Sequence, residues 1–256
     1  MKKIFLLSII ITAFISCTKT INVDLKNEVP HIVIEGVVSN NSFANVRISK
    51  SVTFSSNNVF PGVSGAQVSI SDDHGMHYEL TETSPGNYTD NAFKGIPGNT
   101  YNLSVMVEGK YYTATSAMPL QVNLDTLLLE NISLMGKMKW TAVPQYTDPA
   151  GFGNSYKFIE TINRKRYPNY WVWDDRIIND GVSNIPLFQM DSTVNLKDTI
   201  EVEMQCIDKN VYRYFTALAN VKNSATTPAN PESNIIGGAL GYFSAYTSQK
   251  KKVVVE

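Results

Sequence analysis

The stretch "YNLSVMVEGKYYTATS" (residues 101–116) decides the fold class of this chain. Its first half alternates apolar and polar residues, which places one set of side chains on a single face of an extended strand: Tyr101, Leu103, Val105 and Val107. Glu108 and Gly109 then interrupt the alternation in the way that is typical of a hairpin turn. The stretch therefore predicts two antiparallel strands with one face in a core.

Segments of the same kind fill the first half of the chain. Alternating runs occupy residues 31–39, 44–54 and 66–73. Asp73, His74 and Gly75 predict a hairpin into residues 76–82. "SPGNY" (residues 84–88) predicts a type II turn in which Gly86 takes a positive φ. About seven short strands separated by turns favour a β-sandwich of the immunoglobulin-like or transthyretin-like kind over residues 31–117.

The second half is less regular. "AMPLQVNLD", with Pro119, breaks the alternation and predicts a linker at residues 118–125, followed by a β-rich domain over residues 126–256. We expect strands in "DTLLLEN", "MKWTAV", "SYKFIETINR" and "DTIEVEMQCI". One amphipathic helix is predicted at about residues 208–221, capped by Asp208. Its apolar stripe consists of Val211, Phe215, Leu218 and Val221.

The N-terminus predicts export and lipidation. Lys2 and Lys3 precede a short apolar run, and a small residue stands directly before Cys17. We interpret residues 1–16 as a lipoprotein signal peptide, Cys17 as the lipidated residue and residues 17–30 as a tether that keeps the folded body close to a membrane. Thr18 after the cysteine favours the outer membrane, and the periplasmic and surface faces stay open. The alternatives are an ordinary secretory signal and a retained anchor, for which the apolar run is short.

Net charge and cysteine content limit the classes of partner and the disulfides that we expect. Removing residues 1–16 takes away two lysines and no acidic residue, which leaves 20 basic and 23 acidic residues and a net charge of −3. This balance does not suggest a nucleic acid as partner. Cys206 is then the one unmodified cysteine, so no intramolecular disulfide is expected. It falls on the apolar face of its predicted strand, where a thiol behaves as a small hydrophobic group.

Five segments in order resemble a known family. They are "IVIEGVVS", "VSGAQVSISDDHG" leading to "SPGNYTDNAFKGIPGNTYNLSV", "GNSYKF", "DTIEVEMQCIDKNVYRYF" and "NIIGGALGYFSAY". Together they look like the Bacteroidota lipoproteins classified as domain of unknown function 4249. Members of this family are often encoded beside TonB-dependent outer-membrane receptors, so the resemblance implies an accessory role in uptake, with such a receptor as a candidate partner. It implies no catalytic residues and no cofactor.

Three histidines, His31, His74 and His77, all lie in the first half. "HGMH" beside Asp72 and Asp73 is similar to half of a metal site, but two histidines on a hairpin tip lack the converging ligand set that zinc needs. Solvated turn residues are the favoured interpretation, and we predict no metal site. The chain contains no G-x-S-x-G motif to support a serine nucleophile.

The strongest candidate for a ligand-facing segment is "RYPNYWVWDDRIINDG" (residues 166–181). It combines aromatic rings with carboxylates and a guanidinium group, a mixture that suits sugars, peptides or protein interfaces. The candidate contacts are Tyr170, Trp171, Trp173, Asp174, Asp175 and Arg176. The alternative is that the rings close the second core or its joint with the sandwich.

The glycine-rich stretch "SNIIGGALGYFSAY" (residues 233–246) could be a phosphate-binding loop or part of the scaffold. A proline-rich loop precedes it and strand-forming residues follow it, so Gly237, Gly238 and Gly241 predict sharp bends or close approaches within a C-terminal β element. For function we expect a non-enzymatic, ligand-capturing lipoprotein of an uptake system. An envelope hydrolase acting on glycans or peptides, and a structural or adhesive module, are the alternatives.

Overall fold

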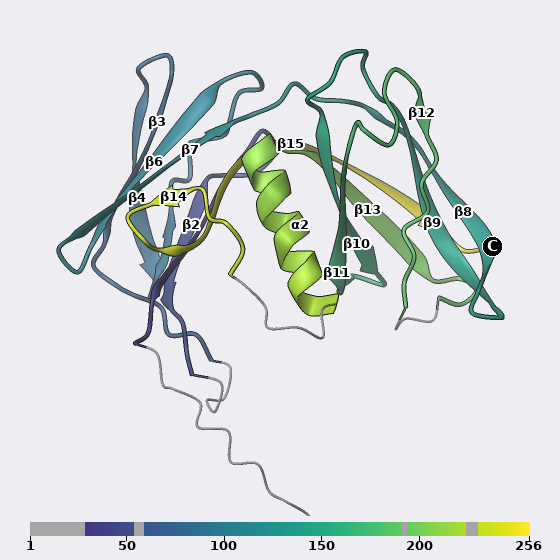
Figure 1. The fold of residues 1–256 in the computed structure, drawn as a ribbon, viewed down its shortest axis with the longest axis horizontal. Helices are drawn as coiled ribbons and strands as arrows, with labels where there is room; N and C mark the ends of the chain where they lie inside the picture. Colours follow the sequence, from purple (N-terminus) through teal and green to yellow (C-terminus); the bar gives the residue numbers. More distant parts are fainter. Residues whose placement is uncertain (1–28, 54–58, 191–193, 224–229) are drawn as a thin grey trace, which may run out of the picture.

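The computed structural model describes residues 29–53, 59–190, 194–223 and 230–256, and Cys17 and the signal sequence lie outside these ranges. Within them the protein is mainly β with a single helix, as the sequence predicts. Figure 1 shows a strand-rich half on each side of this helix. No helix in the described part of the chain is long and apolar enough to cross a membrane.

The first half forms a sandwich. Its strands are β1 (Ile32–Ser39), β2 (Asn45–Lys50), β3 (Gln67–Asp72), β4 (His77–Ser84), β5 (Asn87–Thr89), β6 (Thr100–Val107) and β7 (Lys110–Ala117). One layer runs β1-β2-β5-β4 and the other β4-β3-β6-β7, so that β4 belongs to both. The two layers bury a common core: a Cβ built on Gly36 of β1 would lie 3.3 Å from the Leu103 side chain of β6.

The hairpin predicted for residues 101–116 forms as expected. β6 and β7 pair from Thr100–Ala117 to Val107–Lys110. Glu108 and Gly109 have φ values of 51° and 73°, the left-handed conformation that a tight hairpin turn requires. Tyr101, Leu103 and Val105 are buried, which confirms the predicted apolar face.

The second half contains two further layers. Its strands are β8 (Leu124–Leu134), β9 (Lys137–Thr147), β10 (Ser155–Ile162), β11 (Lys165–Asp174), β12 (Val182–Ser183) and β13 (Thr199–Cys206). A three-stranded layer has the order β12-β9-β8, and the other layer runs β11-β10-β13. A second core lies between them, with Phe158 and Met204 from one layer and Ala142 and Tyr146 from the other.

The last strand joins the two halves. β15 (Leu240–Val254) pairs parallel with β1 through its first seven residues, Leu240 to Tyr246, and antiparallel with β13 from Thr247 to Val254. It therefore extends one layer of the sandwich and one layer of the second half, and Figure 1 shows it crossing between them. The first core also takes in Ile235, Ala239 and Phe243. Residues 118–125 connect the two cores, but the C-terminal segment returns to the first one.

The glycine-rich stretch is scaffold, as its context indicates. β14 (Ile235–Ile236) pairs with β7 at the end of the sheet, and Gly237 and Gly238, with φ values of 114° and 85°, turn the chain into β15. Gly241 has φ 101°, and a Cβ at this position would lie 2.0 Å from the carbonyl oxygen of Ile34. The glycine thus allows the parallel strands β1 and β15 to approach each other.

The helix α2 (Lys209–Asn223) covers the outer face of the second-half sheet. Asp208 caps it as predicted, since its Oδ1 accepts hydrogen bonds from the backbone N–H groups of Asn210 (2.8 Å) and Val211 (3.0 Å). Val211 and Phe215 are buried, and the half-buried residues that pack against them include Leu218, Tyr170 and Tyr242. This third apolar cluster fixes the helix between the two halves.

Candidate functional site

A surface pocket opens beside the first turns of α2. It has a volume of about 600 Å³ and is lined by residues 152–155, residues 174–176 and the helix residues Lys209, Tyr212 and Arg213. We call it the helix-end pocket. Three of the candidate contacts chosen from the sequence, Asp174, Asp175 and Arg176, lie in its wall. The pocket combines aromatic rings with charged groups of both signs.

Asp175 organises the loop on one side of this pocket. Its side chain is buried, and Oδ2 accepts hydrogen bonds from the backbone N–H groups of Gly153 and Asn154, the latter at 2.8 Å. The backbone N–H of Asp175 in turn donates to the carbonyl of Asn154 at 3.1 Å. The carboxylate therefore holds the loop that carries the exposed ring of Phe152 into the pocket wall.

Asp174 and Arg176 form an ion pair at the rim. The Arg176 Nε donates to Asp174 Oδ2 at 2.7 Å, and the Arg176 side chain is 73% exposed. Hydrogen bonds to the Tyr212 hydroxyl and to Asp174 raise the pKa of the Arg176 guanidinium above its usual value. The loop after β11 is thereby attached to the first turns of α2.

Lys209 and Arg213 supply the remaining positive charge. Both are exposed, and within the described part of the chain neither forms an ion pair. They stand four residues apart and so project from the same side of the helix as each other, next to Tyr212. The two cations are free to bind a negatively charged group.

The aromatic residues of the candidate segment do not line this pocket. Trp173 is a core residue: its ring stacks on Phe158 with centroids 4.5 Å apart, and Nε1 donates to the Tyr146 hydroxyl at 2.7 Å. Trp171 is half-buried against the same core, beside Tyr167. Both tryptophans therefore belong to the second core, which was the alternative interpretation of this segment.

Tyr170 points to the opposite face of β11. Its hydroxyl donates to the backbone carbonyl of Phe215 at 3.0 Å, and the two rings meet edge to face. Burial raises the pKa of Tyr170 well above its usual range. This residue secures α2 to the sheet, and so only Asp174, Asp175 and Arg176 of the six candidates reach the pocket.

Two buried ionisable groups lie on opposite faces of β10. Lys157 faces α2, with Nζ 3.6 Å from the ring centroid of Phe215, and burial, reinforced by Arg166, lowers its pKa to about 7. Glu160 faces the second core, where its Oε2 accepts a hydrogen bond from Gln189 and Oε1 has no partner within the described residues. Burial raises the pKa of Glu160 to about 7.

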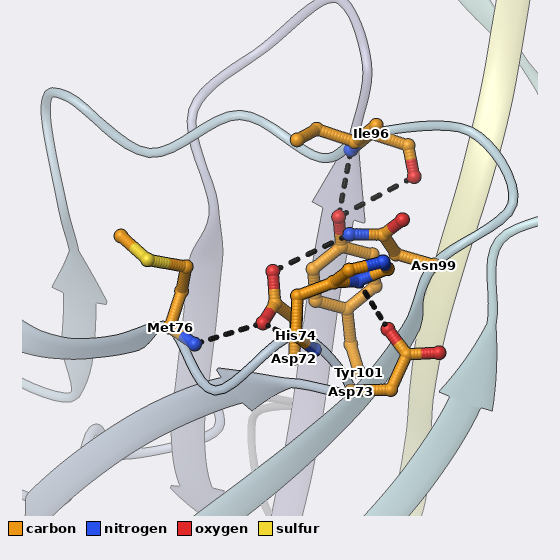
Figure 2. Close-up of polar contacts among 7 residues, drawn as sticks. All are labelled: Asp72, Asp73, His74, Met76, Ile96, Asn99 and Tyr101. Atoms are coloured by element: carbon orange, nitrogen blue, oxygen red, sulfur yellow. Dashed lines mark hydrogen bonds and ion pairs between the residues drawn. The ribbon is translucent and has the colours of Figure 1, made fainter.

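His74 lies in a turn, shown in Figure 2, and His77 is the first residue of β4. Asp72 Oδ1 accepts hydrogen bonds from the backbone N–H groups of His74 (3.0 Å) and Met76 (2.9 Å), and Oδ2 accepts one from Asn99 (3.3 Å). His74 is exposed and its Nδ1 contacts Asp73 at 3.0 Å. The described residues contain no group of three or more histidine, cysteine or acidic residues able to hold a metal ion.

Cys206 is buried at 4% exposure in the second core, and burial raises the pKa of its thiol. The thiolate that a nucleophile needs is therefore disfavoured.

Sequence reasoning missed Phe152, Lys209, Tyr212 and Arg213 as pocket residues. The helix residues Lys209, Tyr212 and Arg213 had one signal, a polar helix face opposite the apolar stripe, which is common to surface helices. Phe152, which lies in a loop, had none.

These features define a two-core β protein that carries one helix across its joint and a charged, aromatic pocket at the helix start. The chain belongs to the family of domain of unknown function 4249 (DUF4249), whose sequence profile matches residues 18–252. Comparison with curated proteins gives no match. The family description names no activity, so the site itself must indicate one.

Proposed function

We propose that this protein captures a small ligand in the helix-end pocket and serves as a lipid-anchored accessory of a TonB-dependent uptake system in the outer membrane. The observation that carries the proposal is the pocket itself. Its volume of about 600 Å³ suits a small molecule. Its exposed Phe152 ring offers one apolar contact, and Lys209 and Arg213, which form no ion pair with the described residues, offer two charged contacts.

The carboxylates in the pocket support binding over hydrolysis. A glycosidase needs one carboxyl group free to give a proton and another free to attack or to activate water. Here Asp175 is engaged with the backbone of residues 153 and 154, and Asp174 with Arg176. Both groups position the pocket wall. Catalysis on glycans or peptides is the alternative function, and no arrangement of described residues favours it.

The direction of β1 supports a pocket that faces away from the membrane. The chain leading from Cys17 enters β1 at Ile32, whereas Ser39, at the far end of this strand, pairs with Tyr246. The neighbouring residue Ala245 is linked through Ser116 to Asp208, the cap of α2. The eight residues of β1 therefore separate the anchored end from the pocket end by about 25 Å.

The experiment that tests the proposal is isolation of the lipidated protein from native outer membranes, followed by identification of co-purifying proteins. Recovery of a TonB-dependent barrel is the expected result. A Cys17→Ala variant is the control, because it should leave the membrane fraction while keeping its fold. The uptake role would be contradicted if the protein is recovered from the membranes without any receptor and still binds glycans or matrix.

A further inference from the structure

A second hollow lies on the other side of Arg213. It has a volume of about 350 Å³ and is lined by Thr115 of β7, the helix residues Asn210 and Arg213, the loop 232–234 and Ile236 of β14. Arg213 lines both hollows. Asn210 and Arg213 stand three residues apart on one helix face, so the second hollow lies against α2 and shares Arg213 with the helix-end pocket.

The second hollow adjoins the end strand of the sheet. β14 is the last strand in its sheet, with β7 on one side and no described strand on the other. This strand has two residues, and the N–H of Ile235 already donates to Ser233 Oγ at 3.1 Å, so the edge offers an extended chain its carbonyl side rather than this N–H. Addition of a chain to a strand edge is a common way to bind peptides. Ile236, 73% exposed, adds an apolar contact at the same place. Sugars make little use of a backbone edge and an aliphatic side chain, whereas peptides use both.

The helix-end pocket offers the complementary chemistry for a peptide terminus. Lys209 and Arg213 have no ion-pair partner in the described part of the chain. The backbone amides of Asn210 and Val211 are occupied by Asp208, so a carboxylate would be bound by the two cationic side chains. Phe152 and Tyr212 lie beside them and present rings to an apolar side chain.

We infer that the two hollows form one groove for a short free peptide in extended conformation. Its backbone lies along β14, its terminal carboxylate binds Arg213 and Lys209, and its last side chain rests against Phe152 and Tyr212. This assignment rests on the proposed ligand-capture function and names the class of ligand. It also gives Arg213 a specific role as the group that joins the two parts of the site.

The test measures binding of two pools of labelled tetrapeptides by fluorescence polarisation. Both pools end in phenylalanine and have varied residues before it; one has a free carboxyl terminus and the other a terminal amide. We expect the free-acid pool to bind about tenfold more tightly than the amide pool, because one charge-assisted hydrogen bond is lost in the amide. Equal binding of both pools would overturn the inference.

Three variants of the full chain locate the groove. Arg213→Ala should remove the preference for the free acid, and Ile236→Glu should weaken the free-acid pool severalfold by placing a negative charge in the second hollow. Arg47→Ala, which removes an exposed arginine of β2, is the matched control and should change nothing. An unchanged preference in Arg213→Ala would overturn the inference. If neither peptide pool binds but a receptor co-purifies with the protein, the inference fails while the proposed function stands.

Discussion

The hydroxyl of Ser116 donates a hydrogen bond to Oδ2 of Asp208, the residue that caps α2. The hydroxyl oxygen of Ser116 also accepts a hydrogen bond from the backbone N–H of Ala245 at 2.8 Å. A single buried side chain on β7 therefore connects the sandwich, the helix and the strand shared by both halves. The position of the helix-end pocket depends on this connection, because three of the pocket residues lie in the first turns of α2.

Breaking this link should loosen the helix from the sandwich. We expect Asp208→Ala to lower the free energy of unfolding by about 2 kcal/mol, since both the cap and the bond to Ser116 are lost. Ser116→Ala should cost about 1 kcal/mol. A double-mutant cycle in urea should then show a coupling energy of about 1 kcal/mol. Ser133→Ala, at an exposed position of β8, is the control; additive effects of the first two variants would contradict the link.

The two tryptophans of the candidate segment should differ in their effect on stability. Trp173→Phe removes the hydrogen bond to Tyr146 and part of a buried ring, so it should lower the free energy of unfolding by about 1–3 kcal/mol. Trp171→Phe, at a half-buried position, should cost less than about 1 kcal/mol. Denaturant titration of both variants checks the difference. Equal costs would show that Trp173 is not a core residue.

Two glycines of the C-terminal stretch form a matched pair. Both have positive φ, but a Cβ at Gly241 would meet the backbone of Ile34 whereas one at Gly238 would meet nothing within 4 Å. Gly238→Ala should cost about 1–2 kcal/mol for the backbone conformation alone. Gly241→Ala should cost at least about 2 kcal/mol more, because β1 and β15 must move apart. Thermal unfolding distinguishes them, and equal melting temperatures would argue against the close parallel pairing.

Lys157 should make the free energy of unfolding increase between neutral and alkaline pH. Its folded-state pKa of about 7 lies below the unfolded value of 10.5, so the unfolded protein binds more protons between these pH values. Stability should therefore rise from pH 7 to pH 10.5, by on the order of 5 kcal/mol for this group. Lys157→Met should remove that rise and stabilise the protein at pH 7 by about 1–4 kcal/mol. Chemical denaturation across this pH range is the measurement; parallel profiles for the two proteins would refute the expectation.

Glu160 should make the free energy of unfolding decrease as the pH rises from acidic to neutral. Its folded-state pKa of about 7 lies above the unfolded value of 4.5, so the folded protein binds more protons between these values. The contribution is fully present below pH 4.5 and is lost as the pH rises to 7, on the order of 3 kcal/mol. Glu160→Gln, which keeps an acceptor for Gln189, should flatten this part of the profile. An unchanged slope between pH 4.5 and 7 would mean that Glu160 is ionised in the folded state.

The sequence predicted the local elements well. The alternation around Tyr101 and Leu103, the Glu108–Gly109 turn and the helix with its Asp208 cap all form where they were expected. These features depend on neighbours within a few residues, where the periodicity of side chains and the conformational preference of each backbone position act directly. The family of the chain was also predicted correctly, from five sequence segments that occur in the same order as in the family.

The pocket could not be predicted in the same way. Phe152, Asp174 and Lys209 come from three separate segments, and their spacing in the sequence does not indicate that they line one pocket. The alternation of "RYPNYWVWD" could not by itself separate an exposed aromatic face from a core, since a strand buries whichever face another layer covers. Trp173 is buried because β9 and Tyr146 lie opposite it.

The sequence by itself thus determined that this chain is a β protein with one capped helix, because strands and helices are specified by short-range patterns of apolar residues and turns. Only the tertiary structure decided that Gly241 lies against Ile34, that β15 serves both cores and that Arg213 stands between two hollows. The physical reason is that a strand's pattern tells which face is buried but not which distant strand will pair with its edge.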